Sequence, residues 1–255
     1  NYLRLFLLIC TIIAFVIVNS FIINYFDHPL LNRIINSSAY FPIAFTSIGL
    51  LLFINGCNFI DGLNGLLLGT SIIIILFFSY HLYVDQNEIL VLTISLFFTI
   101  LPLFIFNFSY GEILTGDGGA YFLGAIIGSL AIVIANQNVL GAFEIACIMF
   151  YPTMEVIFSG IRRLLNKSNP LNPDAYHFHT IFYKYLLLKY YKKLGLSNNN
   201  FNSLTSFLIL ASILIILLIR EFSVELVHPS LFLLFMCIIY CCAYYILNKK
   251  IKSFN

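Results

Sequence analysis

Carboxylate, amide and imidazole side chains gather in three short polar loops of this chain. The first, residues 58–65, reads Asn-Phe-Ile-Asp-Gly-Leu-Asn-Gly; the second, residues 116–119, reads Gly-Asp-Gly-Gly; the third, residues 174–179, reads Asp-Ala-Tyr-His-Phe-His. The rest of the sequence is mostly Leu, Ile and Phe. Because carboxylates and histidines are costly next to lipid, polar residues clustered where apolar segments end are candidates for function.

The first loop carries donors and acceptors that can hold a nucleotide or a metal ion. Asn58, Asp61 and Asn64 supply these groups, and the two glycines permit a tight turn and a close approach of the backbone to a ligand. The alternative is an Asx-rich turn that only joins two spans. Asp61 is a candidate catalytic residue, and Asn58 and Asn64 are candidate substrate-binding residues.

The second loop places one carboxylate, Asp117, among three glycines at the predicted start of a helix. Exposed backbone N–H groups at such a start attract phosphate, and aspartate suits Mg²⁺, which shares its oxygen ligands with substrate phosphates. The alternative is an N-cap aspartate behind a glycine turn. Asp117 is therefore a candidate metal ligand and catalytic residue, and Asn107, at the end of the preceding apolar segment, is expected near the same mouth.

The third loop combines His177 and His179 with two basic residues just upstream, Arg162 and Arg163. Histidines with arginines suit the binding of a diphosphate. The alternative is a solvated basic loop that binds lipid headgroups. Glu155, near the inner end of its apolar segment, is expected to line a polar cavity or to pair with one of the arginines.

The composition predicts an all-α, polytopic membrane protein. Hydrophobic residues make up 61% of the 255 and charged residues 9%, whereas a soluble domain carries about 25% charge. Spans need about 20 apolar residues, and eight segments approach that length. They are residues 3–25, 41–57, 66–83, 89–106, 120–135, 139–159, 204–219 and 229–247.

We therefore expect a single transmembrane domain, residues 1–255, in which residues 160–203 form the only long polar loop, rich in basic residues and histidine. If the N-terminus lies in the cytoplasm and eight spans alternate, eleven Lys and Arg residues fall on the cytoplasmic side and two, Arg33 and Arg220, on the outer side. Basic residues favour the cytoplasmic side. This topology places all three polar loops in the cytoplasm.

Taken together, the loops resemble those of the polyprenyl-phosphate N-acetylhexosamine-1-phosphate transferases. Residues 58–65 look like the family's Asn-x-x-Asp-Gly-x-Asp-Gly loop, and residues 116–124 look like its Gly-Asp-x-Gly-Ser-x-x-x-Gly stretch. Residues 173–179 look like its Pro-Asp-Arg-x-His-x-His-His loop. Three weak motifs in the right order on eight spans make a strong resemblance.

The resemblance implies a bacterial inner-membrane enzyme whose site faces the cytoplasm. It would transfer a sugar-1-phosphate from a UDP-N-acetylhexosamine to polyprenyl (undecaprenyl) phosphate, release UMP and so initiate a cell-envelope glycan such as O-antigen. Mg²⁺, with Mn²⁺ as an alternative, is the implied cofactor, and nucleic acid is not an expected partner. Membrane lipids surround the chain, and a homodimer is left open.

Some positions depart from the family pattern. Asn64 stands where the family has aspartate, Ala175 where it has arginine, Thr180 where it has histidine and Ala120 where it has serine. The family's Asp-Asp pair in an earlier loop has no counterpart in these 255 residues, which begin without Met. We expect that about three spans and this pair precede residue 1, so that this chain alone is incomplete as a catalyst.

Two other functions stay open from the sequence. A transporter or flippase for a lipid-linked sugar could use the same loops as an inner gate. Transporters usually carry polar residues and broken helices near the membrane midplane, and the span centres here are almost wholly apolar, which favours the enzyme. The third reading is a catalytically degenerate scaffold of the same fold, motivated by the departures at Asn64, Ala175 and Thr180.

Overall fold

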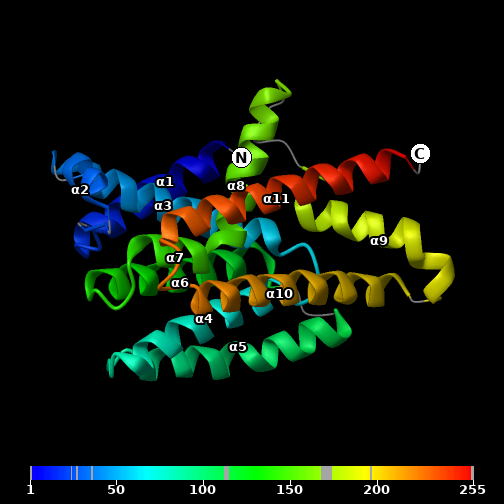
Figure 1. The fold of residues 1–255 in the computed structure, drawn as a ribbon, viewed down its shortest axis with the longest axis horizontal. Coiled ribbons are helices and arrows are strands. Elements are labelled where there is room, and N and C mark those ends of the chain that lie inside the picture. Colours follow the sequence, from blue (N-terminus) through cyan, green and yellow to red (C-terminus); the bar gives the residue numbers. More distant parts are fainter. Residues whose placement is uncertain are drawn as a thin grey trace.

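The computed structural model describes residues 2–23, 25–26, 28–35, 37–111, 115–167, 174–195 and 197–253. Within these ranges every regular element is a helix (Figure 1). The helices are α1 (Tyr2–Val18), α2 (Pro29–Ile35), α3 (Tyr40–Ile60), α4 (Leu66–Val84), α5 (Leu90–Tyr110), α6 (Gly116–Asn136), α7 (Ala142–Ile148), α8 (Phe150–Leu165), α9 (Phe178–Leu194), α10 (Asn198–Phe222) and α11 (Pro229–Lys252).

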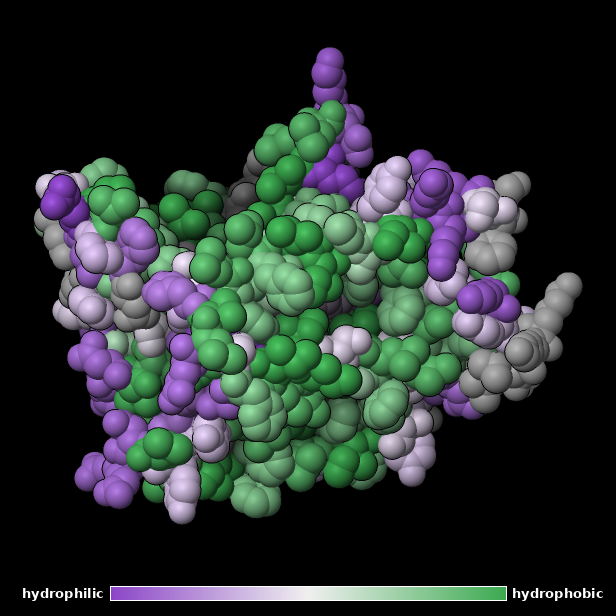
Figure 2. Space-filling model, in the orientation of Figure 1, coloured by the Kyte–Doolittle hydropathy of each residue, from purple (hydrophilic) through white to green (hydrophobic). Residues whose placement is uncertain are grey.

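Six of these helices are long and apolar enough to cross a membrane: α3, α4, α5, α6, α10 and α11. The number is seven if the bent pair α7–α8 forms one span. Figure 2 shows a broad hydrophobic band across the middle of the molecule, with hydrophilic residues gathered toward its two ends. The all-α polytopic fold predicted from the sequence is therefore confirmed, with six or seven qualifying spans where the sequence predicted eight.

The first predicted span, residues 3–25, is shorter in the structure. Its helix α1 ends at Val18, and the Asn19 side chain donates to the Phe15 carbonyl, while Ser20 adopts a left-handed conformation with φ of 53°. At 1.5 Å per residue, the 17 residues of α1 extend about 25 Å, less than the hydrocarbon core of about 30 Å. Polar residues at 19 and 20 end the helix seven residues before the predicted end of this span.

The predicted span 139–159 is not one straight helix. It divides at Met149 into α7 and α8, whose axes differ by 82°. Pro152 explains the break, because proline has no N–H to donate to the carbonyl four residues earlier. In the first turn of α8 that N–H is not needed. As a result, α8 leaves the bundle at a steep angle (Figure 1).

Helix α3 is the centre of the bundle and packs against α1, α6 and α8. Its contacts are close because glycines remove side chains: a Cβ on Gly124 would lie 2.9 Å from the Ile54 Cα, and one on Gly56 would collide with the Pro152 carbonyl. Gly124 and Gly128, one turn apart on α6, thus form a packing surface against α3. This packing fixes α6 and α8 relative to the end of α3.

Several helix ends meet at one end of the bundle, which we call the mouth. Hydrogen bonds there join the end of α3 to the start of α6 and the turn after α3 to the start of α10. Tyr244, near the end of α11, donates to the Tyr176 carbonyl at 3.0 Å. The described stretch 174–195 of the predicted loop 160–203 also supplies helix α9, which packs on α10 and α11. Residues 168–173 of that loop lie outside the described residues.

Candidate functional site at the mouth

The first and second polar loops are joined directly. Asn58, in the last turn of α3, donates from Nδ2 to Asp117 Oδ1 at 2.8 Å, and Asp117 lies in the first turn of α6. The Thr115 hydroxyl donates to Asp61 Oδ1. Two carboxylates and one amide therefore share one surface of the mouth. Each bond joins the first loop to a residue more than 50 positions away in sequence.

Asp61 lies in an environment that disfavours its charge. Burial raises the pKa of this carboxyl above its usual range, and the nearby Asp117 carboxylate acts in the same direction. Hydrogen bonds from the Thr115 hydroxyl and the Gly116 backbone oppose the shift without cancelling it. A carboxylate that is costly to ionise alone is stabilised by a nearby cation, so this side of the mouth favours a positively charged ligand.

Asn64 lies in a network of side-chain amides that joins the first loop to α10. Its Nδ2 donates to Asn199 Oδ1 at 2.6 Å, and its backbone N–H donates to Asn202 Oδ1 at 2.6 Å. Asn107 on α5 accepts the Gly65 N–H with its Oδ1. We call Asn64, Asn107, Asn199 and Asn202 the amide clasp. Because Asn64 and Asn107 are buried, their observed partners give them a clear role in holding the loop.

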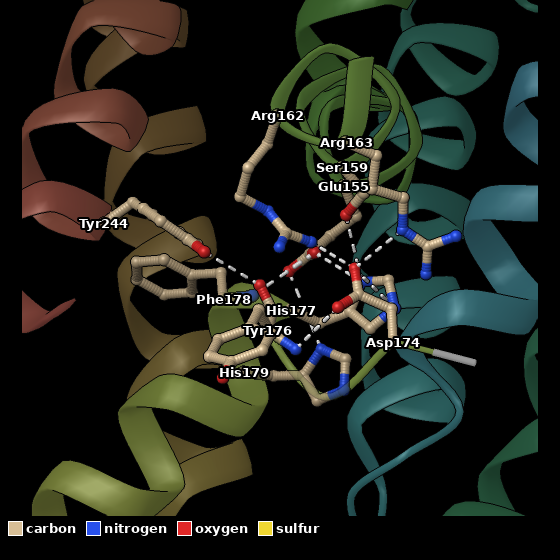
Figure 3. A network of polar contacts seen from close by, with 10 residues as sticks. All are labelled: Glu155, Ser159, Arg162, Arg163, Asp174, Tyr176, His177, Phe178, His179 and Tyr244. Carbon is tan, nitrogen blue, oxygen red and sulfur yellow. Dashed lines mark hydrogen bonds and ion pairs between the residues drawn. The ribbon is translucent and has the colours of Figure 1, made fainter. Parts of the chain in front are cut away.

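The other side of the mouth is an ionic cluster of six residues: Glu155, Arg162, Arg163, Asp174, His177 and His179 (Figure 3). Arg162 donates to Asp174 Oδ2, and Arg163 Nε donates to the same oxygen at 3.2 Å. His177 Nε2 lies 4.0 Å from it. Three basic side chains from two segments thus converge on one carboxylate oxygen.

The pKa of Asp174 falls below its usual range. Burial acts to raise it, but the Tyr176 backbone N–H, the two arginines and His177 together outweigh that effect. The ionised carboxylate is therefore the stable form, and it holds the guanidinium groups in place. Each guanidinium has five N–H donors, which leaves capacity for a further anionic ligand.

Glu155 contacts the histidines, and not the arginines with which the sequence suggested it would pair. His177 Nδ1 lies 3.4 Å from Oε2 and His179 Nδ1 lies 3.6 Å from Oε1. Asp174 takes both arginines because residues 174–179 pass over the end of α8 (Figure 3). The His177 and His179 rings are stacked nearly parallel, at an interplanar angle of 6°.

The third loop also touches the first. The Phe59 and His177 rings meet edge to face, with centroids 4.8 Å apart. A Cβ on Gly62 would lie 2.8 Å from His179 Nε2, so only glycine admits the imidazole this close to the backbone. The first of the three loops predicted to share one side therefore contacts both of the others.

The predicted site residues fall into two groups at this mouth. Asn58, Asp61 and Asp117 share one surface, while Arg162, Arg163, His177 and His179 lie in the ionic cluster. Asn64 and Asn107 are close by but engaged in the amide clasp. Sequence reasoning missed three contributors, Thr115, Asn199 and Asn202. The polar run at the start of α10, Asn198-Asn199-Asn200, was the available signal for the last two.

The donor set fits a magnesium ion that is shared with a substrate. No group of three or more His, Cys, Asp or Glu side chains in the described ranges could hold a metal by itself. Asp117 is exposed and lies beside Asp61 and the Asn58 amide. Mg²⁺ is usually bound by one or two carboxylates together with waters and substrate phosphates, and this arrangement supplies that number of carboxylates.

Comparison with known proteins supports the family resemblance of the polar loops. The profile of glycosyl transferase family 4 matches residues 1–135, a segment that includes the first two loops. The Thermotoga maritima undecaprenyl-phosphate alpha-N-acetylglucosaminyl 1-phosphate transferase is 33% identical over 129 residues, which are 51% of this chain and 39% of that protein. The Dictyoglomus turgidum phospho-N-acetylmuramoyl-pentapeptide-transferase is 37% identical over 116 residues, 44% of this chain and 38% of that protein.

A Bacillus subtilis protein, a probable undecaprenyl-phosphate N-acetylglucosaminyl 1-phosphate transferase, is 33% identical over 130 residues, 49% of this chain and 36% of that protein. No solved structure shows a significant match. The matched segments thus span less than two fifths of these relatives. Because the family profile covers more than half of its length, the chain belongs to glycosyl transferase family 4, and its relatives support the polyprenyl-phosphate N-acetylhexosamine-1-phosphate transferases that its loops resemble.

Proposed function

We propose that this chain carries the catalytic mouth of an enzyme that transfers N-acetylhexosamine-1-phosphate from a UDP-sugar to polyprenyl phosphate. The carrying observation is the contact of all three polar loops: Asn58 with Asp117, and the turn after Asn58 with His177 and His179. Carboxylates and cationic groups face each other across this mouth. A nucleotide diphosphate with a bound cation needs both kinds of group.

In the proposed reaction an oxygen of polyprenyl phosphate attacks the β-phosphorus of the UDP-sugar. A new phosphorus–oxygen bond forms, and the bond from the β-phosphorus to the bridging oxygen breaks. UMP leaves with the electron pair, and a polyprenyl-diphospho-sugar remains in the membrane. Such phosphoryl transfers depend mainly on positioning and on stabilising charge, and these are what the mouth residues supply.

The mouth residues have different proposed roles, according to the chemistry of their side chains. Asn58 and Asp61 bind the nucleotide side, with Asn64 holding that loop through the amide clasp. His177, His179 and the two arginines bind the diphosphate oxygens, which compete with Asp174 for guanidinium N–H groups. Asp117, supported by the Asn58 amide, holds Mg²⁺, or alternatively Mn²⁺. When bound, the ion neutralises the diphosphate and polarises its oxygens.

The bundle holds an apolar cavity suited to the lipid substrate. It has a volume of about 440 Å³, and its walls come mainly from α3, α6, α7 and α8. Its lining is almost wholly apolar, and much of it, such as residues 128–132 of α6 and Leu233 of α11, lies in the half of the bundle away from the mouth. Burial of apolar surface favours binding of an isoprenoid segment there. We assign part of the polyprenyl chain to this cavity and its phosphate to the mouth.

Orientation follows from the basic residues. Arg162, Arg163, Lys184 and Lys189 lie at the mouth end, together with the lysines at the end of α11. Basic residues favour the cytoplasmic side. The proposed enzyme therefore lies in the bacterial inner membrane with its mouth toward the cytoplasm, where UDP-sugars are made.

The first test removes the carboxylate of Asp117. Asp117→Asn keeps the size of the side chain but removes the charge that holds the cation, and we expect UMP release to fall by about 100-fold or more. UMP release from UDP-N-acetylglucosamine is measured with polyprenyl phosphate in detergent. The assay uses the full-length protein.

Asp85→Asn is the matched control, because Asp85 caps α4 at the end remote from the mouth and is exposed. It should leave the rate unchanged. Wild-type turnover by Asp117→Asn would exclude Asp117 from the metal site. Equal losses in both variants would point to a general effect of removing charge.

A further inference from the structure

Glu155 is the most deeply buried ionisable side chain of the mouth. It is 0% exposed and projects from α8 toward residues 174–179 (Figure 3). An ionised carboxylate removed from water needs a cationic or hydrogen-bonding partner. Asp174 engages both nearby arginines, so the donors available to Glu155 come from elsewhere.

Those donors are the two imidazoles and one backbone amide. His177 Nδ1 and His179 Nδ1 approach the two different oxygens of the carboxylate, at 3.4 and 3.6 Å. The Phe178 N–H, between them in sequence, donates to Oε2 at 3.4 Å. The Ser159 hydroxyl lies 3.2 Å from His177 Nδ1. The contact with His177 is the shorter one, and among the described residues the buried Glu155 Oε1 and His179 Nδ1 have no hydrogen-bond partner available other than each other. One carboxylate therefore faces two imidazole rings that stand parallel to each other.

Among the described residues, the other polar side chains close to Glu155 are tyrosines. Tyr151 on α8 and Tyr240 on α11 have buried hydroxyls near the carboxylate, and Tyr244 lies farther out. None of these groups is cationic. The carboxylate therefore depends on the histidines for its charge compensation, as the buried aspartate of a Ser-His-Asp triad depends on its histidine.

This geometry decides which ring atom each histidine can present. An imidazole that donates Nδ1–H to a carboxylate leaves only Nε2 for a ligand. His177 Nε2 faces the Asp174 and arginine side, and His179 Nε2 faces Gly62 in the first loop. Both Nε2 atoms thus point toward the surfaces assigned to the diphosphate and the nucleotide loop.

We propose that Glu155 is a positioning residue that fixes His177 and His179 with Nδ1–H directed inward, so that both present Nε2 to the substrate diphosphate. The contact between these Nε2 atoms and a substrate diphosphate rests on the proposed function. The orientation of the rings does not, because it follows from contacts within the chain. Imidazolium groups formed against the phosphate oxygens would donate their second N–H to Glu155.

The orientation is tested by nitrogen NMR of the purified full-length protein, labelled with ¹⁵N in its imidazoles. The chain has five histidines, and replacing His28, His81 and His228 by Gln leaves His177 and His179 as the only ones in these 255 residues. Both Nδ1 atoms should carry a proton in the otherwise wild-type chain. A ring with unprotonated Nδ1 and protonated Nε2 would overturn the proposal, whether or not the protein is an active transferase.

Glu155→Gln then changes the acceptor to a side chain with one acceptor arm and one donor arm. The donor arm cannot accept Nδ1–H, so one ring should change to the form with the proton on Nε2. Glu155→Asp keeps two acceptor oxygens and should retain Nδ1–H on both rings. Unchanged spectra in Glu155→Gln would contradict the proposal, and Glu155→Asp provides the comparison if the glutamine variant folds poorly.

Kinetics give the second readout. Because Glu155 acts through groups that bind the substrate, Glu155→Gln should raise KM for the UDP-sugar by about 10–100-fold and change kcat less, with partial recovery in Glu155→Asp. Glu221→Gln, at the opposite end where Glu221 pairs with His81, should leave both constants unchanged. Normal KM in Glu155→Gln would overturn the positioning role. No transfer by the wild-type protein would overturn the proposed function alone.

Discussion

The two sides of the mouth hold their polar groups in opposite ways. The amide clasp uses neutral side chains, Asn64 with Asn199 and Asn202, at distances of 2.6 Å. The ionic cluster uses four basic side chains around two carboxylates. Neutral amide pairs are insensitive to pH and salt, whereas ion pairs respond to both. The difference indicates that the clasp fixes the shape of the mouth, and under the proposed function the cluster is the part that exchanges partners with an anionic ligand.

Breaking the clasp sterically should have the largest effect on stability. Gly111 has φ of +66°, and a Cβ there would lie 2.5 Å from Asn64 Nδ2 and 2.7 Å from Asn199 Oδ1. Gly111→Ala adds about 1–3 kcal/mol of overpacking to about 1–2 kcal/mol for the left-handed backbone. We expect a clear fall in the melting temperature, which is measured by far-UV circular dichroism in detergent.

Gly195→Ala separates the two contributions. Gly195 has φ of +61° at the end of α9, but nothing lies within 4 Å of its Cβ position. This variant should lose only the backbone part. If both variants melt at the same temperature, the contact between Gly111 and the clasp contributes nothing, and the clasp is not a rigid element.

The clasp also marks where the sequence was insufficient. Local patterns predicted the apolar helices and three polar loops on one side, because spans and Lys and Arg positions are properties of short windows. The bond between Asn64 and Asn199 joins positions 135 residues apart, and no window contains both. The break between α7 and α8 at Met149 was not predicted for another reason. Hydropathy counts Pro152 as one weakly polar residue and ignores its missing N–H.

Glu155 shows the same limit inside the site. In sequence it precedes Arg162 and Arg163 by about two helical turns, and the sequence left open an ion pair with one of them or a position lining a polar cavity. The third loop passes over the end of α8, and Asp174 takes both arginines while the histidines take Glu155. Which carboxylate meets which base is decided by tertiary packing, not by separation along the chain.

Removing charge from the ionic cluster should have a smaller effect that depends on conditions. The lowered pKa of Asp174 means that its ionised form contributes stability above the unfolded-state pKa, and this contribution disappears as the pH falls through the folded-state pKa. Asp174→Asn should therefore destabilise the protein near neutrality, by on the order of 1 kcal/mol because solvent screens part of the cluster. The difference from wild type should begin to shrink as the pH falls below about 4 and should vanish only below the lowered folded-state pKa.

Asn199→Ala is the matched comparison in the clasp. Asn199→Ala removes a partner of the buried Asn64 amide, and the stability should fall by about 1–3 kcal/mol. This fall should be the same at every pH and should not change between low and high salt. The loss in Asp174→Asn should shrink in high salt. If both variants respond equally to salt and pH, the distinction between a neutral and an ionic side of the mouth is wrong.

The smallest expected effect has the opposite sign. Burial, with Asp117 nearby, raises the pKa of Asp61, so ionised Asp61 costs stability above its unfolded-state pKa of about 3.9. Asp61→Asn keeps an oxygen that accepts the Thr115 hydroxyl and should raise the melting temperature slightly at neutral pH. It should also lower activity, because the charge that destabilises the fold is the one proposed to serve the substrate. A lower melting temperature at neutral pH would show that Asp61 is mainly structural.

The central claim, that the three loops form one site for sugar-phosphate transfer, is tested most directly by following the β-phosphorus. The full-length protein is incubated with UDP-N-acetylglucosamine labelled with ³²P at the β-phosphate, together with polyprenyl phosphate and magnesium. Label should move into the lipid phase while unlabelled UMP appears in water, and Asp117→Asn and His177→Ala should each suppress the transfer. Label that remains in water as UDP, or as intact UDP-sugar, would contradict the account.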